Sequence, residues 1–218
     1  MHMKAGESTQ RRQKHKAKSQ LRGLSLGTMK YAITGGIGSG KSYVCSLLKK
    51  YGISVYDCDQ AAKRLMATER KLQERISETV GKDVFPNGVL NKATLAEFLL
   101  ASKENNEKIN HIVHPAVAAD FHRSGLDWME SAILFEAHFE ENVDQVVCVT
   151  APLETRISRV MKRDGITKSK AEEWINRQMS QEEKVLRSHY IICNDGETPL
   201  IPQIEELLLS IRTKGLSE

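Results

Sequence analysis

The sequence predicts an α/β fold of three layers, with helices covering both faces of a mostly parallel sheet. Short apolar runs alternate with longer amphipathic runs along residues 29–218. A glycine-rich segment joins the first apolar run to the first amphipathic run. Because helix-length segments separate the apolar runs, the strands must be joined by crossovers, and crossovers make neighbouring strands parallel.

The elements expected from this alternation can be placed along the chain. Strands are expected at residues 31–33, 53–56, within 128–135, at 145–150 and at 190–193. Helices are expected from the glycine-rich segment to about residue 51 and at residues 60–80, 92–100, 105–121, 153–163, 168–187 and 201–211. Phe-Pro-Asn-Gly at residues 85–88 predicts a turn.

The glycine-rich segment, residues 34–42, is called the phosphate loop below. It reads Thr-Gly-Gly-Ile-Gly-Ser-Gly-Lys-Ser and contains the pattern G-x-x-x-x-G-K-[S/T]. Glycines let consecutive backbone N–H groups curve around phosphate oxygens, and the following helix points its positive end at the same anion. Lys41 is expected to reach the β- and γ-phosphates, and the Ser42 hydroxyl to bind Mg²⁺. The alternative is a glycine-rich turn that binds nothing.

Two carboxylates follow the second expected strand. Asp57 and Asp59 stand at its carboxyl end, where an open α/β sheet places its ligands. Alternate positions of an extended chain point the same way, so both side chains are expected to face the crevice. One would orient an acceptor hydroxyl and take its proton, while the other would bind Mg²⁺ or accept a hydrogen bond. The alternative is that an Asp here only caps the next helix.

Basic residues gather on the helix expected at residues 153–163. Arg159 and Arg163 are four residues apart and therefore share one helical face. Guanidinium groups stabilise the charge that spreads over a phosphoryl group during transfer. Asp164-Gly165 suits a hinge, so this region is expected to form a mobile lid; a solvated charged surface is the alternative.

Missing signatures narrow the class of phosphate chemistry. No Asp begins a D-x-x-G pattern, which argues against a GTPase switch. The chain of 218 residues is also short for an ATPase module together with the domain it would drive. A compact kinase fits these observations better.

Charge and cysteine content describe the surroundings of this kinase. Residues 1–28 hold seven basic side chains and one acidic one, a net charge of +6, so residues 29–218 are mildly acidic although the whole chain carries +4. We expect a disordered tail, either a tag or an extension from an upstream start, rather than a nucleic-acid-binding arm. The four scattered cysteines suggest reduced thiols of a cytoplasmic protein, and no apolar stretch is long enough for a membrane span.

Several segments together resemble the dephospho-CoA kinase family. They are residues 34–42, 55–59, 110–115, 134–136, 159–163 and 192–194, in matching order and spacing. The resemblance implies a three-layer α/β/α P-loop kinase of residues 29–218, with a helical CoA-binding insertion at about residues 60–122 and a helical lid at about residues 156–187. It also implies ATP-dependent phosphorylation of the ribose 3′-hydroxyl of dephospho-CoA, the last step of CoA synthesis.

The resemblance assigns roles to particular residues. Asp59 looks like the general base, assisted by Asp57, with Lys41, Arg159 and Arg163 acting on the phosphates. His114 would lie near the acceptor and Asn194 beside the adenine. The implied contacts to ATP are Gly36, Ile37, Gly38, Ser39, Gly40, Lys41, Ser42, Tyr43 and Asn194, with Ser42 binding Mg²⁺. A monomer or weak homo-oligomer is expected, with no nucleic acid or membrane partner.

The chain departs from the family pattern at three places. Glu130 and His189 stand where the family usually has Asp, and Tyr43 where it usually has Thr. A kinase of another small nucleoside or nucleotide acceptor therefore remains an alternative. A nucleotide-dependent nucleic-acid-binding protein that uses residues 1–28 is the rival from another class, and it predicts steeply salt-dependent binding.

Overall fold

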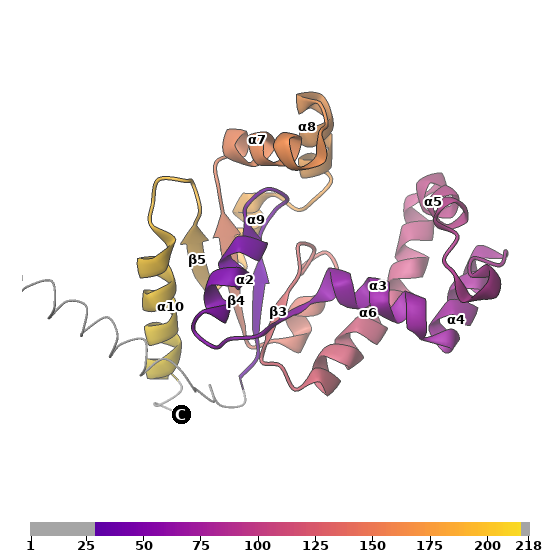
Figure 1. The fold of residues 1–218 in the computed structure, drawn as a ribbon, viewed down its shortest axis with the longest axis horizontal. Coiled ribbons are helices and arrows are strands. Elements are labelled where there is room, and N and C mark those ends of the chain that lie inside the picture. Colours follow the sequence, from indigo (N-terminus) through magenta and orange to yellow (C-terminus); the bar gives the residue numbers. More distant parts are fainter. Residues whose placement is uncertain (1–28, 215–218) are drawn as a thin grey trace, which may run out of the picture.

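The sheet in the computed structural model, which describes residues 29–214, has five parallel strands in the order β2-β3-β1-β4-β5 (Figure 1). The strands are β1 (Tyr31–Thr34), β2 (Val55–Asp57), β3 (Trp128–Glu130), β4 (Gln145–Thr150) and β5 (Tyr190–Cys193). The central strand β1 pairs with β3 on one side and β4 on the other, so the strand order reverses beside it. Ligands of open α/β sheets bind at the carboxyl edge near such a reversal.

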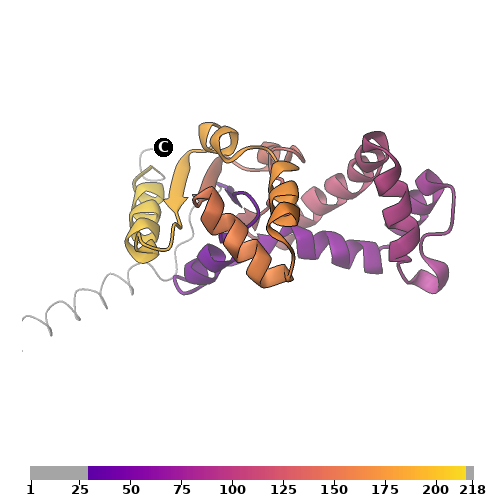
Figure 2. The same ribbon diagram turned by 90° about the horizontal axis from the view of Figure 1, so that it is seen from above.

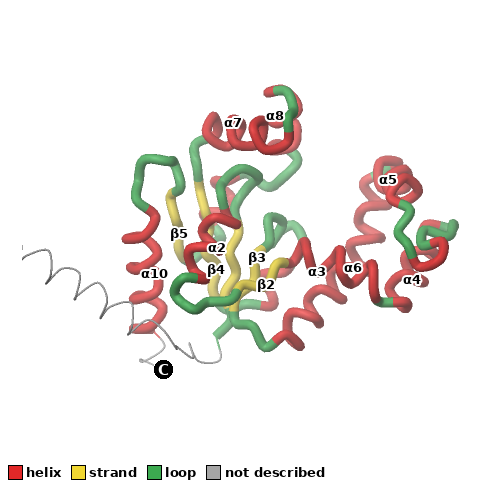
Figure 3. Tube along the Cα trace, viewed as in Figure 1, coloured by secondary structure: helices red, strands yellow, loops and turns green. Residues whose placement is uncertain are grey.

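Helices fill the intervals between the strands (Figure 3). They are α2 (Lys41–Lys49), α3 (Cys58–Thr68), α4 (Arg70–Val80), α5 (Lys92–Ala101), α6 (Lys103–Ser124), α7 (Leu153–Asp164), α8 (Lys168–Asn176), α9 (Gln181–Leu186) and α10 (Leu200–Lys214). Two short 3₁₀ turns are η1 (Pro86–Gly88) and η2 (Phe139–Asn142). The segment 1–28, expected to be a basic tail, lies outside the described residues.

The three-layer arrangement is confirmed. Tyr31 and Ile33 of β1 belong to one buried cluster, which also holds apolar residues of α2 and α10. Ala32 between them belongs to a second cluster, formed with residues of α3, α6 and η2. Successive side chains of a strand point to opposite faces, so this alternation means that helices cover both faces of the sheet. Burial on both faces also explains why β4 reads as a nearly continuous apolar run.

Two helical regions project from the sheet (Figures 1 and 2). Helices α3 to α6 pack mainly on one another and extend to one side of the molecule. Helices α7 and α8, called the α7–α8 pair below, lie over the carboxyl end of the strands and share a small core of their own. Ile37 of the phosphate loop packs against that core, which places the pair against the loop.

Two helices expected to be continuous are each broken. The helix expected at residues 60–80 stops at Glu69, whose backbone is extended (φ −96°, ψ 102°), and restarts at Arg70. The segment expected as one helix at residues 168–187 forms α8 and α9, separated by residues 177–180. Ser180 starts α9 with a capping box to Glu183, a local signal that ends the preceding turn.

Two further expectations needed adjustment. The strand within residues 128–135 is limited to its start, Trp128–Glu130, whereas the apolar residues 133–135 lie in the turn that follows. Because a residue before proline is disfavoured in helical backbone, Pro115 predicts a helix boundary at His114. Helix α6 instead continues through Pro115, so His114 lies inside the helix. The other strands and the turn at residues 85–88 lie close to their expected positions.

Candidate active site

The phosphate loop is held in a shape that only glycine permits at its tightest points. Gly40 caps α2 with φ 90°, and a Cβ at this position would lie 2.1 Å from Nδ2 of Asn194. A Cβ at Gly38 (φ 80°) would lie 2.5 Å from the backbone oxygen of Arg156. The Asn194 amide donates to the Ser39 carbonyl oxygen at 2.8 Å. Elements distant in sequence therefore support the loop, and two of its N–H groups are already engaged: Ile37 donates to Gln178 Oε1 and Ser39 to the Gly36 carbonyl oxygen.

Lys41 begins α2 with its side chain buried against the loop. Its ammonium donates to the Gly35 carbonyl oxygen at 2.9 Å. Burial lowers the pKa of Lys41, while the nearby carboxylates of Glu130 and Asp59 oppose that shift. The structure thus places a desolvated cation between the loop and two acids, and a phosphate chain would supply the remaining negative charge.

A cavity of about 590 Å³ opens over the loop. It is lined by Ile37, Gly38, Gly40, Lys41, Ser42, Asp59, Glu130, Ala132, Ile133, Arg159, Val160, Arg163, Trp174 and Gln178. The loop, the α3 terminus and the α7–α8 pair thus meet around one space. Six residues of the expected site do not line this cavity, namely Gly36, Ser39, Tyr43, Asp57, His114 and Asn194.

Asp57 and Asp59 differ in their surroundings, although the hollows that they line adjoin at Ser42 and Glu130. Asp57 ends β2 and caps α3, accepting from the Gln60 N–H at 2.9 Å. Cys58 already begins the helix, so the alternation of an extended chain does not apply to Asp59. Asp59 lines the cavity over the loop, whereas Asp57 lines the adjoining hollow beside α2. The helix-cap alternative describes Asp57, and the cavity interpretation describes Asp59.

Glu130 joins the end of β3 to the start of α2. The Ser42 hydroxyl donates to its Oε1 at 3.2 Å, and the Cys45 thiol donates to its Oε2 at 3.3 Å. Burial and the Glu130 carboxylate raise the pKa of Cys45, so this thiol stays protonated and remains a donor. A hydroxyl and a carboxylate at this distance are the oxygen ligands that suit Mg²⁺ and its bound water.

The basic residues of α7 have separate structural positions. Arg156 is buried and donates from Nε to the Ile37 carbonyl oxygen at 2.9 Å, so it supports the loop from behind. Arg159 contacts the carbonyl oxygens of Gly38 and Ser39 at 3.3 and 3.4 Å. Arg163 lines the cavity and pairs with its neighbour Asp164 at 2.7 Å. Of the basic residues of α7, Arg159 and Arg163 line the cavity where phosphates would lie.

A smaller apolar cleft of about 200 Å³ begins beside Asp59. Its walls come from α3, α5, α6 and the segment after β3, and its polar members are Asp59, Asn110, His114 and Ser131. Burial lowers the pKa of His114, which keeps its imidazole neutral. The buried Ser131 hydroxyl has no hydrogen-bond partner among the described residues. This cleft can accept a largely apolar group with a few polar atoms.

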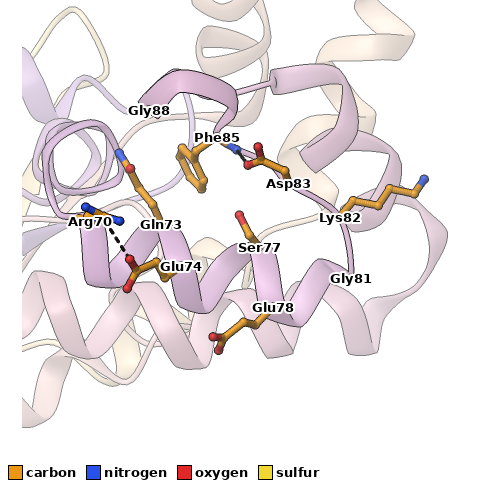
Figure 4. A pocket seen from close by; sticks show the side chains of 10 residues that line it. All are labelled: Arg70, Gln73, Glu74, Ser77, Glu78, Gly81, Lys82, Asp83, Phe85 and Gly88. Atoms are coloured by element: carbon orange, nitrogen blue, oxygen red, sulfur yellow. Dashed lines mark hydrogen bonds and ion pairs between the residues drawn. The ribbon is translucent and has the colours of Figure 1, made fainter.

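A third cavity, of about 750 Å³, lies away from the phosphate loop between α4 and the segment around η1 (Figure 4). Arg70 pairs with Glu74 across its wall, and Asp83 accepts from the Phe85 N–H. Its polar side chains do not converge on a common point in the view of Figure 4. We assign no chemistry to it.

Sequence reasoning missed or undervalued several cavity residues. Gln178 and Trp174 line the cavity from the segment after α8 and from α8 itself, and neither belongs to a recognisable motif. Glu130 was noted only as a departure from a pattern. His189, which also stands where the family usually has Asp, accepts from the Val146 N–H through Nδ1 at 3.0 Å and so serves the β4–β5 junction.

In the described part of the chain, no helix is long and apolar enough to cross a membrane. Residues 29–214 also contain no cluster of three or more His, Cys, Asp or Glu side chains arranged to hold a metal ion. A magnesium ion here would therefore depend on phosphate oxygens together with the Ser42 and Glu130 oxygens.

Comparison with known proteins points in one direction. A family model described as dephospho-CoA kinase matches residues 29–199. The dephospho-CoA kinase of Bacteroides fragilis (strain YCH46) is 44% identical over 193 residues, covering 85% of this chain and 94% of the relative. That of Porphyromonas gingivalis (strain W83) is 38% identical over 192 residues, covering 84% of this chain and 94% of the relative.

Solved structures share the fold. The crystal structure of TT1252 from Thermus thermophilus has a TM-score of 0.70 and 30% identity, covering 85% of this chain and 97% of that one. A dephospho-CoA kinase from Campylobacter jejuni has a TM-score of 0.54 and 20% identity, covering 86% of this chain and 94% of that one. The second likeness supports the fold alone.

Proposed function

The chain belongs to the dephospho-CoA kinase family, and on that premise we propose that it transfers the γ-phosphoryl group of ATP to the ribose 3′-hydroxyl of dephospho-CoA. The products are CoA and ADP, so the reaction completes CoA synthesis. The family match covers the phosphate loop, the α3–α6 region and the α7–α8 pair. Each of these parts carries one element of the proposed reaction.

The position of Asp59 carries this proposal. Asp59 lines both the cavity over the phosphate loop and the apolar cleft between α3 and α6. Ile133 is the other residue that lines both spaces. A triphosphate held by the loop and an acceptor held in the cleft would therefore meet at this carboxylate. An apolar cleft of this kind suits the pantetheine-bearing end of dephospho-CoA better than a small polar acceptor.

The chemistry at this point is a direct displacement. Asp59 accepts the proton of the 3′-hydroxyl while the 3′-oxygen forms a bond to the γ-phosphorus. The bond from the γ-phosphorus to the β–γ bridging oxygen breaks at the same time. ADP leaves with that bond's electron pair. Asp57 assists by capping α3, which fixes the first helical turn that carries Asp59.

Cationic groups from the loop and from α7, together with Mg²⁺, would stabilise the negative charge of the transferring phosphoryl group. Lys41 faces it from the loop, and Arg159 and Arg163 face it from α7, which we propose as part of a lid. The first amides of α2 would hold the β-phosphate. Ser42 and Glu130 would hold Mg²⁺, which offsets phosphate charge when bound. Asn194, packed beneath Gly40, would act on ATP through the loop as well as beside the adenine.

Location and assembly belong to the same proposal. An enzyme that uses ATP and carries four unpaired cysteines fits the reducing cytoplasm. A monomer or weak homo-oligomer suffices, because all the groups invoked come from one chain. No nucleic acid or membrane partner is needed for this chemistry.

The test is ATP consumption with dephospho-CoA, set against adenosine, AMP and other nucleosides as acceptors. Dephospho-CoA should be preferred by orders of magnitude, and mass spectrometry should find the new phosphate on the 3′-oxygen. Asp59→Asn should lower turnover by several orders of magnitude while leaving ATP affinity nearly unchanged. Asp57→Asn is the matched control, and its loss should be smaller. A nucleoside used as well as dephospho-CoA would favour the alternative kinase.

A further inference from the structure

Gln178 touches the phosphate loop from a distant part of the chain. It lies between α8 and α9, and the Ile37 N–H donates to its Oε1 at 2.7 Å. This N–H belongs to the loop whose amides are the expected anion donors. A neutral side chain therefore holds one loop donor in a cavity that Lys41, Arg159 and Arg163 also line.

That contact settles how the Gln178 amide is oriented. A backbone N–H can only donate, so the side-chain atom that meets it must be the carbonyl oxygen. The amide nitrogen, Nε2, then faces away from Ile37 with two N–H donors. Among residues 29–214, no group accepts from Nε2, although Gln178 lines the cavity. The side chain thus offers unused donors to whatever fills that space.

The ligand class follows from the donors and their place. Phosphate oxygens are acceptors and match an amide N–H. The β-phosphate is expected at the first amides of α2, residues 40–42, because the helix dipole favours an anion there. Gln178 lies instead beside Ile37, in the cavity that also reaches Asp59. Its donors therefore point to the phosphoryl group beyond the β position.

We propose that Gln178 contacts the γ-phosphoryl group of ATP and thereby distinguishes ATP from ADP, a positioning role that rests on the proposed function. Lys41, Arg159 and Arg163 attract any polyphosphate through their charge. An amide carries no net charge, so its contribution depends on an oxygen at hydrogen-bonding distance. It can therefore add affinity for ATP without adding the same affinity for ADP.

The contact also couples nucleotide binding to the α7–α8 pair. Gln178 follows α8 directly, and Ile37 packs its side chain against the core of the pair. A γ-phosphoryl group bound by Nε2 would fix the end of α8 over the loop. ADP leaves those donors unused, so after transfer the end of α8 is held less firmly.

Binding of ADP and of the β,γ-imido analogue of ATP, each with Mg²⁺, tests this proposal by calorimetry. Gln178→Glu is the sharpest variant because its carboxylate can still accept from Ile37 but has no donor to offer. Its preference for the ATP analogue over ADP should fall by tenfold or more, and that of Gln178→Met by about tenfold. In Gln178→Met, which adds no charge, a purely structural role would weaken both ligands alike.

Gln181→Met is the matched control. Gln181 also accepts from a backbone N–H, that of Ala151 at 3.0 Å, but it does not line the cavity. Its ligand preference should equal that of the wild type. An unchanged preference in Gln178→Glu, or equal losses for both ligands, overturns the role of Gln178 alone. A wild-type chain that binds neither nucleotide contradicts the proposed function as well.

Discussion

The ammonium of Lys184 on α9 is fully buried and donates to both carboxylate oxygens of Glu136, at 2.8 and 2.9 Å. It also donates to the Ala132 carbonyl oxygen at 2.9 Å. Ala132 and Ile133 line the cavity over the phosphate loop. The pair therefore ties α9 to the segment that separates the phosphate cavity from the apolar cleft.

Removing the acid of this pair should cost more stability than removing the base. Glu136→Leu leaves a buried cation without its counter-charge, and the free energy of unfolding should fall by about 3–5 kcal/mol. Lys184→Met should cost less, because the Glu136 side chain keeps 26% of its surface exposed and water can solvate it. Urea unfolding measures both values.

The double variant supplies the control for this prediction. Leu and Met together remove both charges, so the double variant should be more stable than Glu136→Leu alone. If the two single variants lose equal stability and the double variant loses their sum, the two side chains act independently. That result would contradict the coupling described here.

Sequence reasoning reached the elements that have a strong local signal. The strands at residues 145–150 and 190–193 were placed at the observed bounds, because both are apolar runs flanked by polar or turn residues. The phosphate loop was found because its chemistry requires fixed residue types at fixed spacing. Strand β3 was located less well, since its last residue, Glu130, faces the site and breaks the apolar run.

Residues that depend on tertiary contacts could not be found in this way. Gln178 lies 141 positions from Ile37 in the sequence, and a single glutamine carries no periodic signal. The different surroundings of Asp57 and Asp59 follow from where α3 begins, which is a matter of one or two residues. Sequence patterns do not define a boundary that closely.

Gly40→Ala should abolish nucleotide binding through steric conflict. The new methyl would meet the Asn194 amide at 2.1 Å and would also occupy a left-handed backbone conformation. Moving Asn194 releases the Ser39 carbonyl and the adjacent amides, so ATP affinity should fall by at least about a hundredfold. Calorimetric titration with ATP measures this loss.

Gly52→Ala separates the two causes. Gly52 has almost the same backbone angle (φ 87°), but a Cβ there would meet nothing within 4 Å. It should lose about 1–2 kcal/mol of stability from backbone strain and keep its ATP affinity. Equal ATP affinities in the two alanine variants would show that packing against Asn194 is unimportant.

Arg163→Ala should lower kcat far more than it changes the KM for dephospho-CoA. Its guanidinium lines the cavity, so its charge is expected to act on the phosphoryl group during transfer. Loss of such an arginine costs on the order of a thousandfold in rate in phosphoryl transferases. Steady-state kinetics over both substrates separates the two parameters. A change confined to KM would remove Arg163 from the transfer step.

Asp164→Asn is the control for Arg163. Asp164 pairs with Arg163 through the Arg163 Nε and Nη2 atoms, at 3.0 and 2.7 Å. Most of the Arg163 side chain is exposed, so the pair adds little stability. Removing the carboxylate leaves the guanidinium in place, and kcat should change by less than about tenfold.

The last prediction concerns pH and His114. Burial is the main cause that lowers the pKa of this imidazole, and His111 and His138 lower it further. Below the unfolded-state value of about 6.5, the unfolded chain binds a proton that the folded chain refuses. Stability from this source is therefore present above that pH and is lost as the pH falls.

When the pH is lowered from roughly 7.5 to 5.5, across the unfolded-state pKa of histidine, the wild type should lose more stability than His114→Gln. His122→Gln is the control, because it alters another histidine of α6 and keeps His114. It should lose as much stability over this pH range as the wild type does. Urea unfolding at each pH gives the comparison, and parallel curves for wild type and His114→Gln would mean that the imidazole does not lose its proton on folding.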